Sequence, residues 1–140
     1  MIIDDIKAAN VEAVKAHDHN LRAIYSILIN KYMQAQIEAR LTKREVNDDD
    51  MVRIIQKTIK ELTEEADNYA RVGNAQEQNN IILQRECIEK YLPKMLTSEE
   101  IHSIINGLSD KSIPSVMRHF KTNYGSRVDM KMVSDELKKF

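Results

Sequence analysis

The stretch LQRECIEKYLPKMLTSEEI, residues 83–101, predicts where one helix stops and the next one starts. Pro93 lacks the amide that a helix interior needs, and it disfavours helical angles at the residue before it. A helix should therefore end just before Pro93. Thr97 is a typical N-cap residue, and Glu100 three positions later matches the pattern of a capping box.

Apolar residues on either side of this cap strengthen the boundary. Leu96 and Ile101 are spaced as a hydrophobic staple, which would fix the direction in which the new helix leaves. Because the stop and the start are independent signals, we predict an N-terminal subdomain over residues 1–93 and a C-terminal subdomain over residues 94–140.

The composition predicts an all-α fold. The 140 residues include only 3 Gly and 2 Pro, which leaves little material for the turns of a β-sheet protein. Aromatic residues make up 5% of the chain and Trp is absent, so we expect a core of aliphatic and methionine side chains.

Apolar residues at helical spacing predict four helices in the first subdomain and three in the second. We expect them at about 2–16, from a cap at Asp18 or Asn20 to about Arg40, from Asn47 or Asp48 to about 72–74, at roughly 75–91, from Thr97 to Gly107, from about Ser112 to Gly125, and from Asp129 onward.

For two of these helices, the sequence also predicts how the helix ends or how deeply it is buried. Gly107 is expected as the left-handed residue that follows a helix. The helix over 75–91 has two adjacent apolar stripes, and we expect it to be buried on more than one side as the spine of its subdomain. The stripes consist of Ile81, Ile88 and Leu92, and of Leu83, Cys87 and Tyr91.

No recognisable catalytic or metal-binding motif occurs. His17 and His19 are two positions apart, whereas helical metal ligands are four apart, so exposed histidines near a cap are the better interpretation. Cys87 lies among apolar residues and is expected to be a buried, inert thiol. With no glycine-rich phosphate loop either, we predict a protein that is not an enzyme and has neither a cofactor nor a metal.

Charge is distributed unevenly along a chain whose net charge is −1. Residues 111–140 contain seven Lys or Arg and three acids, whereas the first 110 residues contain fourteen and nineteen. This asymmetry is a modest indication that the end of the chain meets an anionic partner. Ordinary solvated helix faces would explain it equally well.

The segment KTNYGSRVDMK, residues 121–131, concentrates basic side chains beside the start of the last expected helix. Cations together with free helix amides form a plausible phosphate site, and an aromatic ring could stack on a base. The alternative is a corner between helices, with solvated lysines and a tyrosine in the core. The candidate nucleic-acid-binding residues are Arg118, Lys121, Tyr124, Arg127 and Lys131.

The expected location is the cytoplasm. One cysteine suits a reducing compartment, no signal peptide is recognisable, and the longest apolar run, residues 24–29, is too short to span a membrane.

Several segments resemble the GatB/YqeY family, over nearly the whole chain. Residues 15–22 are similar to the lysine-rich start of that family's second helix. Residues 69–73 and 86–93 resemble its "KAGR…E…I…YLP" run, and residues 96–101 resemble its "LSEEEI". Residues 116–137 are similar to its "VM…G+AD…V…L" ending.

The resemblance implies a helical protein without catalysis of its own. The family includes free-standing proteins and the C-terminal tail of the B subunit of tRNA-dependent amidotransferases, a tail that reaches the body of the tRNA. We therefore expect a partner in tRNA or in a tRNA-charging or amidotransferase complex. The alternative is a protein–protein interaction module that does not bind RNA and uses surfaces such as Met95 and Met130.

Overall fold

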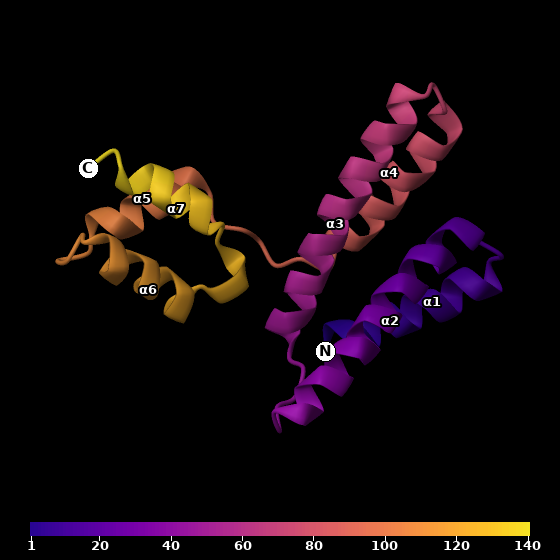
Figure 1. Cartoon of the computed structure of the whole chain (residues 1–140), viewed down its shortest axis with the longest axis horizontal. Coiled ribbons are helices and arrows are strands. Elements are labelled where there is room, and N and C mark those ends of the chain that lie inside the picture. The colour runs from indigo at the N-terminus through magenta and orange to yellow at the C-terminus, as the bar shows by residue number, and fades with distance from the viewer. The chain divides into compact units, whose positions relative to one another are not determined.

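The computed structural model is all-α, as predicted (Figure 1). It describes residues 1–140, except that at Ser126 it describes the backbone alone. No strand occurs among these residues. The elements are α1 (Ile2–Lys15), α2 (His19–Leu41), α3 (Asp48–Arg71), α4 (Ala75–Glu89), α5 (Ser98–Asn106), α6 (Ile113–Asn123), the short 3-10 helix η1 (Gly125–Arg127) and α7 (Met130–Leu137).

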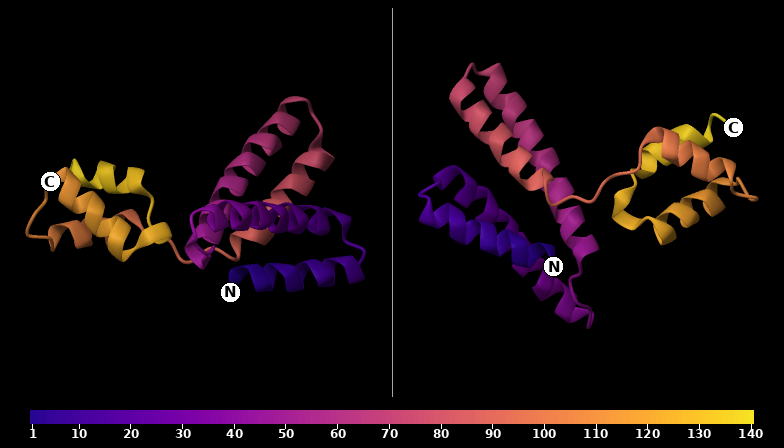
Figure 2. Two further views of the ribbon diagram at one scale, coloured as in Figure 1. Left: turned by 60° about the horizontal axis from the view of Figure 1, so that its bottom comes forward. Right: turned by 180° about the vertical axis from the view of Figure 1, so that it is seen from behind.

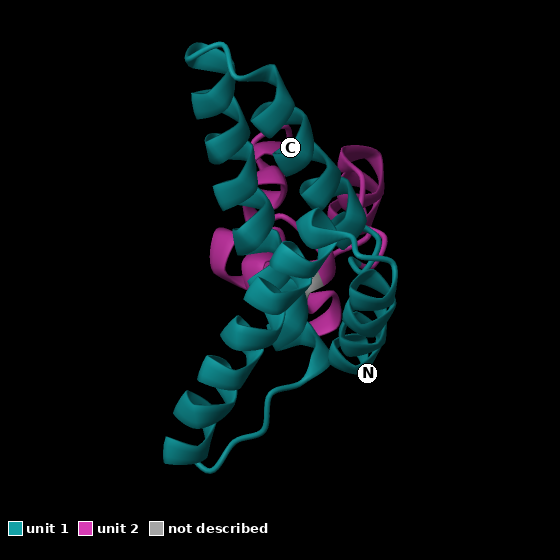
Figure 3. Ribbon diagram, turned by 90° about the vertical axis from the view of Figure 1, so that its right-hand side faces the viewer, with its two compact units in different colours: residues 1–92 teal, residues 93–140 magenta. Residues whose placement is uncertain are grey.

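The chain forms two compact units, Met1–Leu92 and Pro93–Phe140 (Figure 3). We call them unit 1 and unit 2 and describe each by itself. Among the helices that the structure describes, none is long and apolar enough to cross a membrane.

Unit 1 consists of two helical hairpins, in which α1 pairs with α2 and α3 pairs with α4 (Figures 1 and 2). Lys31 of α2 joins the hairpins, since its Nζ donates hydrogen bonds of 2.9 Å to Thr58 Oγ1 and to Glu61 Oε2 of α3. The core is aliphatic with a few tyrosines, as in Ile6, Ile24, Leu28, Tyr32, Met51, Ile55, Leu62 and Ile88.

Unit 2 has a core of its own, in which α7 packs against both α5 and α6. Leu96 and Ile101 are both buried there, at the staple positions that the sequence predicts. The other buried members are Ile105, Val116, Phe120, Val128 and Val133.

Side-chain caps fix where several of the helices begin, among them α2, α5 and α3. Asp18 Oδ1 accepts from the Leu21 amide at 3.1 Å, and Thr97 Oγ1 accepts from the Glu100 amide at 3.2 Å. The predicted box at Thr97 differs in detail, because the Glu100 carboxylate accepts from the Thr97 hydroxyl. Asn47 and Asp50 form a reciprocal capping box, with hydrogen bonds of 2.9 and 3.1 Å.

The expectation that the fourth helix is buried on two sides is wrong. Leu83 on its second stripe is 51% exposed, and Cys87 is only partly buried. A polar residue, Gln84, is buried instead, because its side-chain amide donates to the backbone carbonyl and the side chain of Asn20 on α2. The helix also ends at Glu89, two residues earlier than expected.

Three helices of unit 1 are followed, two positions after their last residue, by a residue with left-handed backbone angles. These residues are His17 (φ 56°), Lys43 (φ 54°) and Gly73 (φ 74°). The amides at and after each of them bond back to the last helical turn, for example from Asn74 to the Tyr69 carbonyl at 3.0 Å. The left-handed angle expected at Gly107 is wrong, because its φ is −78°.

Candidate nucleic-acid interface

The candidate site is the corner in which α6 passes through η1 into α7. Gly125 turns the chain at φ 52°, an angle that side chains disfavour. The Arg127 amide then donates to the Tyr124 carbonyl at 3.0 Å, and the Arg127 carbonyl accepts from the Leu96 amide at 2.9 Å. Because Val128 is buried directly after the turn, the corner is anchored in the core of unit 2.

Four of the five predicted residues present exposed positive charges along this corner. Arg118 and Lys121 are one helical turn apart on α6, Arg127 lies on η1, and Lys131 lies in the first turn of α7. None of the four forms an ion pair within the part of the chain that the structure describes. We call these four residues the basic corner. Their charges are therefore available to an external anion.

Tyr124, the fifth predicted residue, is half-buried at the end of α6. Its ring centroid lies 5.6 Å from that of Phe120 and 6.2 Å from that of His119. The ring packs against the core of unit 2, so only part of it faces solvent. This placement agrees with the alternative interpretation of a core tyrosine.

The first turn of α7 is already occupied by a carboxylate. Asp129 is the N-cap, and its Oδ1 accepts from the Lys131 amide at 2.9 Å. This oxygen accepts from one of the amides at the start of α7 that were expected to bind a phosphate, and it adds a negative charge there. An anion would therefore be held by the side chains of the basic corner rather than by the helix terminus.

A buried carboxylate on α7 was not predicted. Glu136 is 7% exposed, and it accepts from Lys139 Nζ at 2.9 Å and lies 3.3 Å from His102 Nδ1. The hydrogen bond from Lys139, together with its charge and that of His102, outweighs desolvation and lowers the pKa of Glu136. The only sequence signal is its position three residues after the buried Val133, on the inner face of the helix.

The methionines that the protein–protein alternative named are not free surface groups. Met130 packs against the core of unit 2, and Met95 is partly buried. These two side chains therefore offer little apolar area to a partner.

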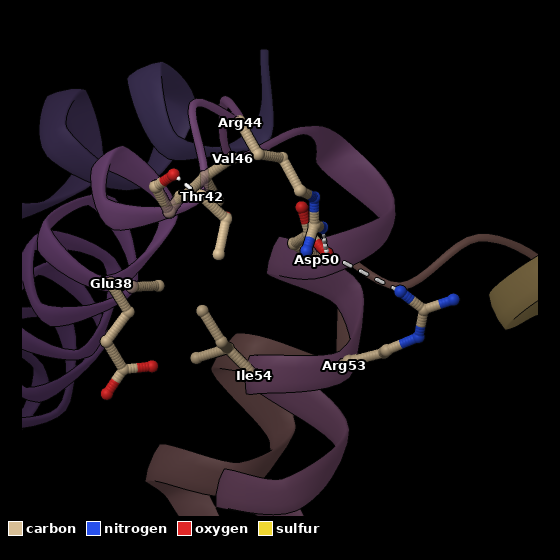
Figure 4. A pocket seen from close by; sticks show the side chains of 9 residues that line it. Glu38, Thr42, Arg44, Val46, Asp50, Arg53 and Ile54 are labelled. Carbon is tan, nitrogen blue, oxygen red and sulfur yellow. Dashed lines mark hydrogen bonds and ion pairs between the residues drawn. The ribbon is translucent and has the colours of Figure 1, made fainter.

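A pocket of about 280 Å³ lies in unit 1, between the end of α2 and the start of α3 (Figure 4). Val46 and Ile54 point into it, and Glu38 lies on the opposite side from the arginines. Asp50 pairs with Arg44 and with Arg53, and the second pair is 3.5 Å apart.

The carboxylate in this pocket is suited to structure rather than to proton transfer. Burial opposes ionisation of Asp50, but the Asn47 amide and the two arginines outweigh it and lower the pKa of Asp50. A general base at neutral pH needs a raised carboxyl pKa. Asp50 instead stays ionised and holds the 42–47 loop against α3.

Metal-ligand chemistry also lacks a cluster to support it. In the residues that the structure describes, no three His, Cys, Asp or Glu side chains come together as ligands would.

Burial is the main cause that raises the pKa of Tyr25, and the neighbouring Tyr91 and Cys87 raise it further. The Tyr25 phenol therefore stays protonated.

Fold and site together define a small all-α protein with two helical units and an exposed basic corner. A family model described as Yqey-like protein matches residues 3–140, and the chain belongs to this family. Comparison with curated proteins gives no match.

Proposed function

We propose that this protein is a non-catalytic accessory protein that binds tRNA, either free or within a tRNA-charging or amidotransferase complex. The contact is made by the basic corner of Arg118, Lys121, Arg127 and Lys131. The observation that carries the proposal is that these four exposed cations form no ion pair among the described residues, while they lie on α6, on the anchored turn that follows it and in the first turn of α7.

Phosphate binding by such a corner is favourable because it costs no internal ion pair. Each lysine or arginine that neutralises a phosphate releases condensed counterions, which is the main source of affinity for nucleic acid at low salt. Phosphate contacts position a protein without reading base sequence, so binding with little sequence preference is expected.

The choice of tRNA among RNAs rests on resemblance. The ending of the chain, from Val116 to Leu137, is similar to the tail of amidotransferase B subunits. The same segment contains the basic corner. The assignment as non-catalytic is supported by the low carboxyl pKa values of Asp50 and Glu136, which make both groups poor proton acceptors at neutral pH.

The test is the affinity of the protein for fluorescently labelled bulk tRNA, measured by anisotropy at ~50 and ~200 mM salt. Four phosphate contacts predict a loss of about 50- to 150-fold in affinity between these two salt concentrations. The variant Lys121→Ala/Arg127→Ala/Lys131→Ala should reduce the slope of log affinity against log salt by about 2 to 3.

The matched control is Lys57→Ala/Lys60→Ala/Arg71→Ala, which removes the same charge from exposed positions on α3. This variant should bind tRNA as the unmodified protein does. If both variants weakened tRNA binding equally, the loss would come from the change in net charge and not from the basic corner. Absence of binding at ~50 mM salt would contradict the proposal and favour a protein partner.

A further inference from the structure

Helix α2 has a second apolar face, opposite to the one that it buries. Ile24, Leu28 and Tyr32 face the core of unit 1. The four apolar side chains on the other side are exposed by 43%, 52%, 61% and 83%, and they are Ile27, Met33, Ile37 and Leu41. A helix of a small globular domain normally has polar residues on this side.

The outer face follows the spacing of a helix–helix seam. Six exposed positions of α2 are separated by steps of four, three, four, three and four residues, the repeat of a coiled-coil contact. We call them the α2 seam: Ala23, Ile27, Asn30, Gln34, Ile37 and Leu41. None of the six is charged.

The residue pattern of the α2 seam is the same in either chain direction. The series of steps is unchanged on reversal, and the residues follow the order apolar, apolar, amide, amide, apolar, apolar. Two copies placed antiparallel would therefore align Ala23 with Leu41, Ile27 with Ile37, and Asn30 with Gln34. The large Leu41 would meet the small Ala23, and each central amide would meet another amide.

We propose that the α2 seam is the contact between two copies of this chain, packed antiparallel about a two-fold axis near residue 32. A two-fold contact requires a surface that is complementary to itself, and the reversed pattern of the α2 seam supplies this property. An unrelated partner would give no reason for the symmetry. The central amides fix the register, because a shift would place Asn30 or Gln34 against an apolar side chain.

The expected dimer is weak. Nineteen residues of helix span about 28 Å. A single pair of such helices lies at the small end of specific interfaces, below about 1,200 Å² of buried surface. Weak association is therefore expected, so it needs to be measured over a wide concentration range.

Sedimentation equilibrium of the full chain from ~5 to ~500 µM tests the proposal with two charged variants. In an antiparallel pair, Asn30→Lys/Gln34→Glu places each lysine opposite a glutamate of the other copy, so dimerisation should persist or strengthen. Asn30→Lys/Gln34→Lys places lysines opposite one another, and the dissociation constant should rise at least tenfold. A parallel pair would repel in both variants.

Ile37→Glu should also abolish association, whereas Leu83→Glu, at an exposed apolar position of α4, should not. Circular dichroism melts establish that each variant is folded, which is expected because all of these positions are at the surface. A monomer throughout the concentration range would overturn the proposal. Equal dissociation constants of the two lysine-containing variants would also overturn it. Equal effects of Ile37→Glu and Leu83→Glu on association would do the same.

Discussion

Individual residues at the helix ends of unit 1 bear backbone angles that their types disfavour. His17 and Lys43 occupy the left-handed region that Gly73 occupies at the equivalent place after α3. The sequence indicates the end of α3 at about 72–74, where Gly73 stands, but gives no such signal at His17 or Lys43, because neither residue type favours a left-handed angle. Side chains with a Cβ atom destabilise such positions.

Replacement of Lys43 by Gly should therefore stabilise unit 1. The strain that is relieved at the left-handed angle is larger than the extra conformational entropy that glycine loses on folding. We therefore expect a gain of about 0.5–1 kcal/mol in the free energy of unfolding in urea. Lys60→Gly, in the interior of α3, is the control and should cost about 1 kcal/mol. A loss of stability in Lys43→Gly would contradict the interpretation of this helix end.

Glu136 should make unit 2 sensitive to acid. Its pKa is lower in the folded protein than the ordinary value of 4.5, so its ionised form stabilises the fold above that value. This stabilisation is lost as the pH falls through the folded pKa. We expect Glu136→Gln to lower the melting temperature of unit 2 at neutral pH, and to reduce the further loss seen on acidification below pH 4.5.

The matched control for this pH dependence is Asp135→Asn, which removes an exposed acid on the adjacent position of α7. This variant should melt as the unmodified protein does at neutral pH. Identical acid sensitivity of Glu136→Gln and the unmodified protein would show that the Lys139 and His102 contacts do not stabilise the folded state.

At the scale of elements, local signals in the sequence predict the helices well. Caps at Asp18 and Thr97 and the stop before Pro93 all act within a few residues, so spacing and residue type reveal them. The burial of Gln84 on α4 could not be predicted, because its partner Asn20 is 64 residues away in sequence.

The start of α3 offers a direct test of such local signals. Asn47→Ala removes the side-chain half of the capping box, the Oδ1 that accepts from the Asp50 amide, and should cost about 1 kcal/mol in the free energy of unfolding. Urea unfolding followed by circular dichroism measures this loss. Asn47→Asp, which keeps a capping oxygen, should retain most of the stability; equal losses in both variants would argue against the cap as the cause.

At the scale of the whole molecule, the sequence indicates the basic corner but not its detailed geometry. The exposure of Arg118, Lys121, Arg127 and Lys131 follows from their polar positions on short helices. That Tyr124 packs inward depends on Phe120 and His119, and on how α6 meets the core of unit 2. That packing could not be derived from the spacing of charges.

The most direct test of RNA binding by the basic corner is a map of amide chemical shifts, recorded by NMR on the full chain as bulk tRNA is added at ~50 mM salt. The proposal predicts shifts concentrated in residues 118–131, which reverse when the salt is raised to ~200 mM. Shifts confined to residues 1–92, or no shifts at all, would contradict it.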